Sequence, residues 1–145
     1  MTLDDWLYGE TDDACALCNV KDPQCLTVHH IDDNHSNNTY ENTIVLCHNC
    51  HQRHHQGKGI TREDIERRKK HLIRKTVTHQ GMSAMKIAAR NGFGVVALPF
   101  LLYHLVSLGY MTKEEAQMGY GIQEDATARF AITDKGREVL ARWLE

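Results

Sequence analysis

The sequence predicts an α+β protein, and three features support this class. Two β-branched runs, CLTVHHI at residues 25–31 and TIVLC at residues 43–47, flank a polar, turn-forming loop and favour a β-hairpin. Two Cys-x2-Cys pairs bracket this hairpin, and helical patterns predominate from residue 61 onward. We therefore expect a small hairpin-and-helix domain at 1–60, a basic connecting helix at 61–80 and a second domain at 81–145.

Composition places the chain among globular proteins. Its 145 residues are 41% hydrophobic and 25% charged, which suits one ordinary domain or two very small ones. The acidic N-terminus lacks the features of a signal peptide, and no window approaches the roughly 20 apolar residues that cross a bilayer. We expect a cytoplasmic protein without a membrane partner, in which the five cysteines are thiols or metal ligands.

The net charge of −2 conceals three blocks of different charge. Residues 1–50 hold nine acidic residues against one lysine, a charge of −8, and residues 51–80 hold nine basic residues against three acidic ones, a charge of +6. Residues 81–145 are balanced at seven of each. The middle block is a candidate anion-binding surface, whereas the first block would repel a polyanion unless a metal ion neutralises part of it.

The predicted elements after the hairpin follow in order. A short helix is expected from about His48 to the glycines near residue 57, and Thr61 with Asp64 forms a capping-box pattern at the start of the basic helix. In the second domain we expect helices at 83–91 and 95–109, a strand at 128–133 and a closing helix at 134–145. Pro99 is compatible with a first helical turn.

The cysteine spacing predicts a structural zinc site. Cys15 with Cys18, and Cys47 with Cys50, are two Cys-x2-Cys pairs separated by 28 residues. Two such pairs supply the four thiolates of a tetrahedral structural zinc. Cys25 falls outside the pairs and is interpreted as a buried free thiol on a strand.

Four cysteines saturate a zinc ion, so the histidines are available for another task. His51 and His55 are spaced i, i+4 and share one helical face, which suits the binding of a single ion. His29 and His30 are adjacent on a strand and point to opposite faces, so they are not two equivalent ligands. One could bind metal while the other accepts a proton, an arrangement suited to hydrolysis.

The order of these motifs resembles the HNH endonuclease family in its four-cysteine form. The resemblance covers about residues 12–56 and rests on LTVHHIDD at 26–33, YENTIVLC at 40–47 and HNCH at 48–51. It implies a β-hairpin and a helix around one catalytic metal, the ββα-metal fold, with a metal-dependent endonuclease activity on DNA.

Carried over position by position, the resemblance implies that His30 is the general base and that His29 and His51 bind the catalytic ion. Asn42 would be the middle residue of the family's name and would brace the loop that orients His30. His55 matches an additional ligand of the histidine-rich members. Many members carry Asp where this chain has His29. Histidine-rich sites accept zinc, nickel or manganese, whereas magnesium prefers oxygen ligands. The expected catalytic ion is therefore Mg²⁺, Mn²⁺, Ni²⁺ or Zn²⁺.

The basic run after this site has two interpretations. It is either a solvated helix face or a set of phosphate contacts that position DNA without reading its sequence. Its members are Arg62, Arg67, Arg68, Lys69, Lys70, Arg74 and Lys75.

Six further histidines receive no functional role. His54 is the strongest candidate for such a role among them because it adjoins His55 in sequence. On a helix, however, it faces about 100° away from His55. The six are His35, His48, His54, His71, His79 and His104.

Residues 81–145 resemble a winged-helix domain, through LPFLLYHLVSLGYM at 98–111 and ARFAITDKGREVLARWLE at 128–145. The helix in the recognition position carries no Lys or Arg, so direct reading of base edges by it would be weak. We favour a core or homodimer contact for its apolar residues, and Arg129, near the expected wing, is the candidate for DNA contact.

Two functions from different classes are compatible with the sequence. The first is a metal-dependent HNH endonuclease in which His30 activates water and the ion stabilises the phosphorane and the departing 3′ oxygen. The family resemblance implies products with 5′-phosphate ends. The second is a zinc-containing winged-helix protein that binds DNA or regulates without cutting, and a metal-binding adaptor is a weaker third. The nuclease is favoured because each expected catalytic position is filled. Restriction, phage defence or mobile-element biology would suit such an enzyme.

Overall fold

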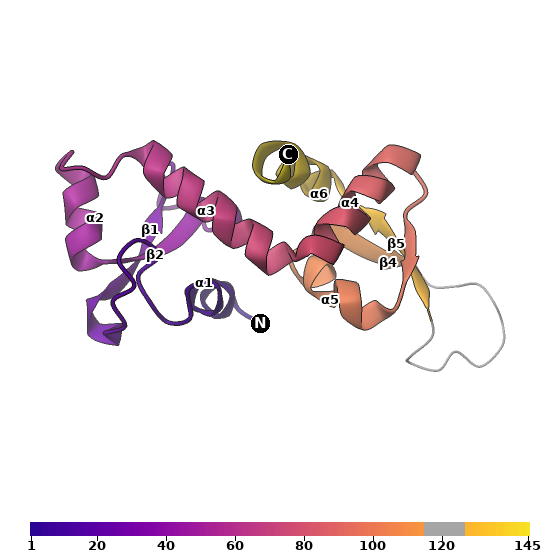
Figure 1. Ribbon diagram of the computed structural model, residues 1–145, viewed down its shortest axis with the longest axis horizontal. Helices are drawn as coiled ribbons and strands as arrows, with labels where there is room; N and C mark the ends of the chain where they lie inside the picture. Colours follow the sequence, from indigo (N-terminus) through magenta and orange to yellow (C-terminus); the bar gives the residue numbers. More distant parts are fainter. Residues whose placement is uncertain (115–126) are drawn as a thin grey trace. The chain divides into compact units, whose positions relative to one another are not determined.

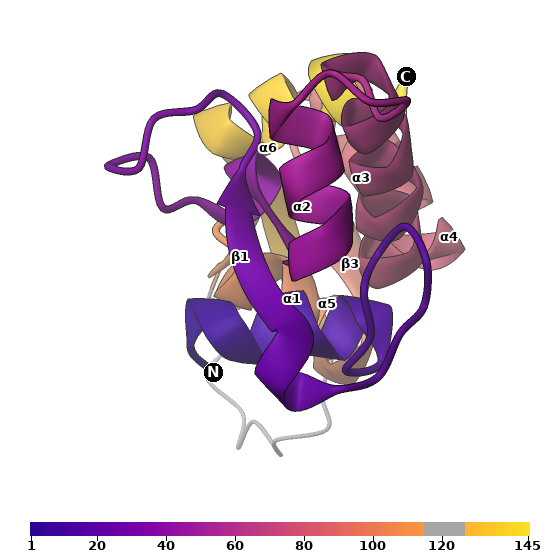
Figure 2. The same cartoon turned by 90° about the vertical axis from the view of Figure 1, so that its left-hand side faces the viewer.

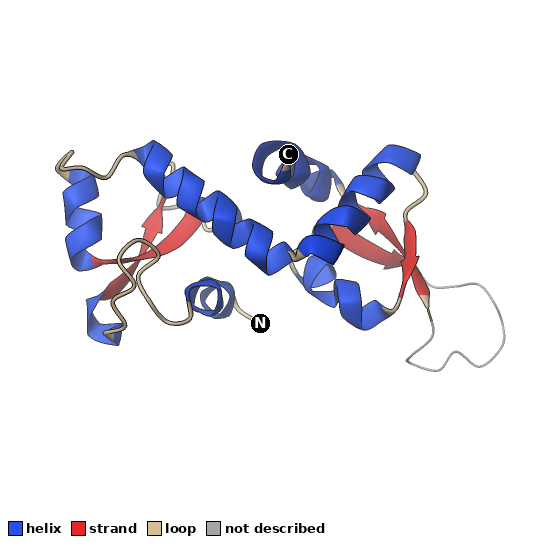
Figure 3. Cartoon of the chain, viewed as in Figure 1, coloured by secondary structure: helices blue, strands red, loops and turns tan. Residues whose placement is uncertain are grey.

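The computed structural model describes residues 1–114 and 127–145 and confirms the α+β class, with helices and two small antiparallel sheets in the described residues (Figure 3). The chain divides into two compact units, Met1–Thr76 and Val77–Glu145. Among these described residues, no helix has the length and apolar character that a bilayer span requires.

The first unit contains a hairpin with helices packed against it (Figure 1). Its elements are α1 (Leu3–Thr11), η1 (Pro23–Cys25), β1 (Leu26–His30), η2 (Tyr40–Asn42), β2 (Thr43–Cys47), α2 (His48–His55) and α3 (Arg62–Val77), the last residue of α3 belonging to the second unit.

The expected hairpin is confirmed. β1 and β2 pair antiparallel with Val28 opposite Val45 and His30 opposite Thr43. All five residues of β2 are buried, because α1 contacts this strand and α2 contacts both strands of the hairpin. Figure 2 shows α2 beside β1. This continuous burial explains why TIVLC is apolar without alternation.

Helix α1 was not expected from the sequence. Thr2 and Asp5 form a capping box at its start, with the Asp5 amide donating to Thr2 Oγ1 and the Thr2 amide to Asp5 Oδ2. Leu7 is fully buried in this helix, which contacts β2, while the acidic residues of the first turn suit the positive end of the helix dipole. The acidic segment is thus part of the fold of this unit.

A buried ion pair joins α1 to α3. The Glu10 carboxylate accepts hydrogen bonds from Lys69 Nζ at 2.7 Å and from the Tyr40 hydroxyl at 2.5 Å, and both charged side chains are 0% exposed. The ammonium also lies 3.8 Å from the centroid of the Tyr40 ring. Lys69 is therefore withdrawn from the candidate phosphate contacts, because its charge is enclosed and already paired.

The second unit holds a three-stranded antiparallel sheet in the order β3-β5-β4. Its elements are α4 (His79–Asn91), β3 (Val95–Ala97), α5 (Pro99–Ser107), β4 (Met111–Glu114), β5 (Ala128–Ile132), α6 (Asp134–Val139) and a π-helical turn at Leu140–Leu144. The connection between β4 and β5, where a wing was expected, lies outside the described residues.

The helix expected at 95–109 starts later than predicted. Residues 95–97 form strand β3, and α5 begins at Pro99, which occupies its first turn. Val95 pairs with Phe130 of β5. Gly94 precedes the strand with φ 107°, and a Cβ there would lie 2.3 Å from the Phe130 carbonyl oxygen, so the strand approaches β5 only with glycine at this position.

Candidate metal centres

Four cysteine side chains converge at the base of the hairpin. The Sγ atoms of Cys15, Cys18, Cys47 and Cys50 all lie within 4.8 Å of one another, and those of Cys18 and Cys47 are 3.6 Å apart. These four thiols could hold a structural metal such as zinc, as the spacing predicts.

Local backbone geometry places these thiols. The Cys15 amide donates to the Val20 carbonyl at 2.9 Å and the Asn19 amide to the Cys15 carbonyl at 3.0 Å, which closes the turn around the first pair. Asn19 adopts φ 65°, a conformation that Asn tolerates better than most residues. In the second pair, Cys47 is the N-cap of α2 and its sulfur accepts the Cys50 amide at 3.3 Å.

The thiols differ in acidity. Burial opposes ionisation of Cys15, but hydrogen bonds from the backbone at Cys18, Cys47 and Leu17 outweigh it and lower its pKa to about 7. Burial, together with the neighbouring sulfurs, raises the pKa of Cys50 well above its ordinary value. A divalent cation would offset the repulsion that otherwise prevents all four from ionising.

Cys25 corrects one expectation. It lies at the end of η1 rather than on a strand and is partly exposed, and its Sγ donates to Asp22 Oδ2 at 3.3 Å. The aspartate raises the pKa of this thiol, so it is held in the protonated form.

Three histidines form a second cluster. His29 is 2% exposed, and candidate ligand atoms of His29, His51 and His55 lie within 4.8 Å of one another. The Nε2 atoms of His51 and His55, one helical turn apart on α2, are 2.9 Å apart. We name these residues the His29–His51–His55 triad.

The electrostatics of the triad suit a cation. Burial, and then the neighbouring His51, His54 and His55, lower the pKa of His29 to about 4. The pKa of His51 is also lowered, mainly by burial. His29 is therefore neutral near pH 7, and its Nε2 is buried without a hydrogen-bond partner in the described part of the chain. A buried nitrogen left in this state fits a metal ligand.

His30 lies next to the triad but has different surroundings. Its Nε2 is 2.7 Å from Asn38 Oδ1, which can only accept, so Nε2 carries the hydrogen and Nδ1 presents the lone pair. Nδ1 is enclosed and lacks a partner among residues 1–114 and 127–145. The ring of His35 lies 4.9 Å from that of His30, centroid to centroid. An unpartnered nitrogen acceptor can take up a proton, and a general base at this position requires that water reach the enclosed Nδ1.

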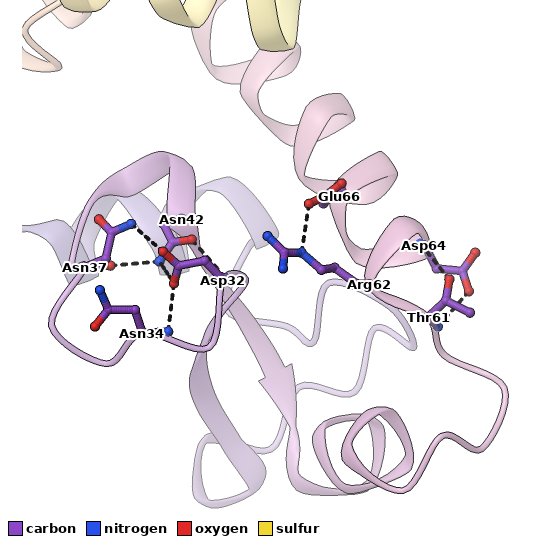
Figure 4. A network of polar contacts seen from close by, with 8 residues as sticks. All are labelled: Asp32, Asn34, Asn37, Asn42, Thr61, Arg62, Asp64 and Glu66. Carbon is purple, nitrogen blue, oxygen red and sulfur yellow. Dashed lines mark hydrogen bonds and ion pairs between the residues drawn. The ribbon is translucent and has the colours of Figure 1, made fainter.

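Asn42 spans the loop that follows β1 (Figure 4). Its Oδ1 accepts the Asp32 amide at 3.1 Å, and its Nδ2 donates to Asp32 Oδ1 at 2.8 Å and to the Asn37 carbonyl at 2.9 Å. Hydrogen bonds from Asn37, the Asn34 amide and Asn42 lower the pKa of Asp32 to about 2. The loop carrying Asn38 is thus tied back to the residues next to His30.

The basic residues of α3 fall into three groups. Arg62 pairs with Glu66 (Figure 4) and Arg67 with Asp64, while Arg68 Nε donates to the Ala16 carbonyl beside the cysteine cluster. Lys69 is buried, and Lys70 is partly buried with interactions of its own. Arg74 and Lys75 are exposed and have no ion-pair or hydrogen-bond partner in the described residues.

Arg129 lies on β5 opposite Glu114 of β4 and forms an ion pair with it. Its side chain is half exposed. Contact with DNA would require this residue to exchange its partner.

Three residues near the histidines had no role predicted from the sequence: Asn38 beside His30, and Asp33 and His54 beside His29. His54 was separated from the triad because of its angle around α2. The aspartate and asparagine lie in a polar loop whose path the sequence does not specify.

No protein-family model, no curated protein and no solved structure matches the chain. The resemblance to HNH endonucleases therefore rests on the residues quoted above.

Proposed function

We propose that the first unit is a metal-dependent endonuclease that hydrolyses DNA phosphodiester bonds. The observation that carries this proposal is that two adjacent histidines have different surroundings. His29 is buried within a cluster of ligand atoms, whereas His30 is outside that cluster and is held by Asn38 with Nδ1 unpartnered. A cation position next to a base is what phosphodiester hydrolysis requires.

Each residue of the site has a role in this proposal. His30 takes a proton from the attacking water at Nδ1, while Asn38 keeps the hydrogen on Nε2. Asn42 maintains the loop that supplies Asn38. The His29–His51–His55 triad would hold a divalent ion, which would supply positive charge to stabilise the developing negative charge of the reaction. The four cysteines would hold a zinc ion that ties the turn after α1 to the junction of β2 and α2.

Exposed basic residues of α3 provide the phosphate contacts in this proposal. Arg74 and Lys75 are the strongest candidates because they are exposed without a partner in the described part of the chain. Arg62 and Arg67 would first release their acidic partners, which reduces the gain from each contact. Such contacts would position DNA and make its binding depend on salt.

The second unit is proposed to act as a winged-helix-like dimerisation domain. Phe93, Val96, Phe100 and Tyr103 are large apolar or aromatic side chains with about half or more of their surface exposed. Two copies of the active site would be needed to cut both strands, and a twofold dimer would supply them. Light scattering at micromolar protein tests this point, and a monomeric mass would contradict it.

The function is tested by conversion of supercoiled plasmid. Zinc-loaded protein is incubated with Mg²⁺, Mn²⁺ or Ni²⁺, or with EDTA, and the products are separated as nicked and linear forms. We expect cutting with at least one ion and none with EDTA, and ends that ligate without prior phosphorylation. Binding of DNA without cutting under every ion would instead favour the regulatory, non-cleaving protein.

A further inference from the structure

Two side chains outside the His29–His51–His55 triad also reach His29. Asp33 lies in the loop after β1, and His54 lies in the last turn of α2. Candidate ligand atoms of His29, Asp33 and His54 are within 4.8 Å of one another, and the rings of His29 and His54 are 5.0 Å apart, centroid to centroid. This second set shares one residue with the triad.

The tautomer of His54 is fixed by the backbone. Its Nδ1 lies 2.9 Å from the Ile60 carbonyl oxygen, which can only accept, so Nδ1 carries the hydrogen and Nε2 presents a lone pair. A histidine whose second nitrogen donates to a carbonyl is oriented in the way usual for metal ligands. This hydrogen bond is independent of the proximity of the three ligand atoms.

The other two members also have free ligand capacity. His29 Nε2 is buried and unpartnered within residues 1–114 and 127–145. The Asp33 side chain is exposed and makes no hydrogen bond or ion pair with any described residue. Two imidazoles and a carboxylate with no competing partner form a complete set of three protein ligands.

We propose that His29, Asp33 and His54 form a second divalent-cation position that overlaps the His29–His51–His55 triad. In this proposal the buried, unpartnered His29 Nε2 is the ligand atom that both sets share, so the cluster holds a single cation in one of two ligand sets. The set with the carboxylate favours harder ions such as Mn²⁺, and the set with three imidazoles favours Ni²⁺ or Zn²⁺. This cation position is independent of whether the protein cuts DNA.

The test is titration of Co²⁺ into the full chain with its cysteine cluster already loaded with zinc, followed by calorimetry and visible absorption. Wild type is expected to bind one equivalent. The double variant His51→Ala/His55→Ala should also bind one equivalent. Its affinity should be lowered at least about ten-fold, because even the loss of a residue that only hydrogen-bonds a metal ligand weakens metal binding by that factor. Adding Asp33→Ala and His54→Ala to that double variant should abolish binding.

Two controls separate this proposal from general damage to the fold. His48→Ala changes an exposed histidine of α2 that belongs to neither set, and it should leave binding unchanged. Asp33→Asn keeps the size of the side chain and should weaken Mn²⁺ binding more than Ni²⁺ binding. Zinc content and thermal midpoint confirm that each variant is folded.

Loss of all Co²⁺ binding in His51→Ala/His55→Ala, with zinc content and thermal midpoint retained, would overturn the second position. Retained binding in the quadruple variant would overturn it as well, because the cation would then lie elsewhere. Equal weakening of Mn²⁺ and Ni²⁺ by Asp33→Asn would refute direct ligation by the carboxylate.

Discussion

Replacement of Lys69 by methionine is predicted to destabilise the first unit strongly, although the lysine belongs to a basic run. The substitution removes the ammonium that lies 2.7 Å from Glu10 and leaves a carboxylate that is 0% exposed with the Tyr40 hydroxyl as its remaining close donor. Breaking a buried ion pair by removal of one partner costs about 3–5 kcal/mol.

The structure limits this cost, because Glu10 can take up a proton instead of remaining charged. With an ordinary pKa of 4.5, protonation at pH 7 costs about 3 kcal/mol at roughly 1.4 kcal/mol per pH unit. The folded variant then binds a proton that the unfolded chain releases, so its stability relative to wild type increases as the pH falls from 7 towards 4.5. We therefore expect a loss of about 3 kcal/mol at pH 7 and roughly half of that near pH 5.5.

The assay is urea unfolding of the zinc-loaded chain in a Trp143→Phe background, so that Trp6 on α1 reports on the first unit. Lys75→Met, on the exposed face of the same helix, is the matched control and should change stability by under about 0.5 kcal/mol. Addition of Glu10→Gln to Lys69→Met should restore part of the loss, because the buried charge is removed. A loss below about 1 kcal/mol, or one that does not depend on pH, would refute this reasoning.

Three further predictions concern the site. Asn38→Ala should lower the rate of DNA cleavage roughly five-fold with little change in KM, because it removes a hydrogen bond to His30 worth about 1 kcal/mol. An unchanged rate in single-turnover assays would contradict the tautomer assignment of His30. Cys50→Ser should lower zinc affinity and the stability of the first unit by several kcal/mol, because the hairpin and α2 meet at this cluster, and circular dichroism with zinc titration measures both. Arg74→Ala and Lys75→Ala should each weaken DNA binding and reduce the slope of log affinity against log salt by about one, and binding isotherms between low and moderate salt would reveal an unchanged slope.

The hairpin, α2 and α3 could be predicted because their signals are local. β-branched runs bounded by turn-forming residues mark the strands, and Thr61 with Asp64 forms the expected capping box, in which the Asp64 amide donates to Thr61 Oγ1 at 3.1 Å. The four-cysteine cluster was predictable for the same reason, since its spacing encodes its geometry.

The burial of Lys69 also had a signal in the sequence. Ile65, Lys69 and Leu72 follow the i, i+4, i+7 pattern of one helix face, and both neighbours are buried. The charge of the surrounding run obscured this position. Its partner Glu10 is far away in sequence and could not be predicted from local patterns.

Strand β3 could not be distinguished from a helix by local pattern, because Val95–Ala97 runs directly into an apolar segment. Its pairing with Phe130 is decided by a contact distant in sequence and by the space that Gly94 leaves. The approach of Asp33 and His54 to His29 depends likewise on the path of a polar loop and on the angle of α2 against the hairpin.

The most direct test of the account is single-turnover cleavage of a DNA duplex by wild type and by His30→Ala, at matched zinc content and in the divalent ion that supports plasmid cutting. His71→Ala, an exposed histidine on α3, is the control. His30→Ala is expected to retain its fold and cation binding but to cleave about 10²–10⁴-fold more slowly, the range expected for loss of a general base, while the control cleaves normally. Cleavage by His30→Ala at the wild-type rate would contradict the assignment of this histidine and, with it, the proposed mechanism.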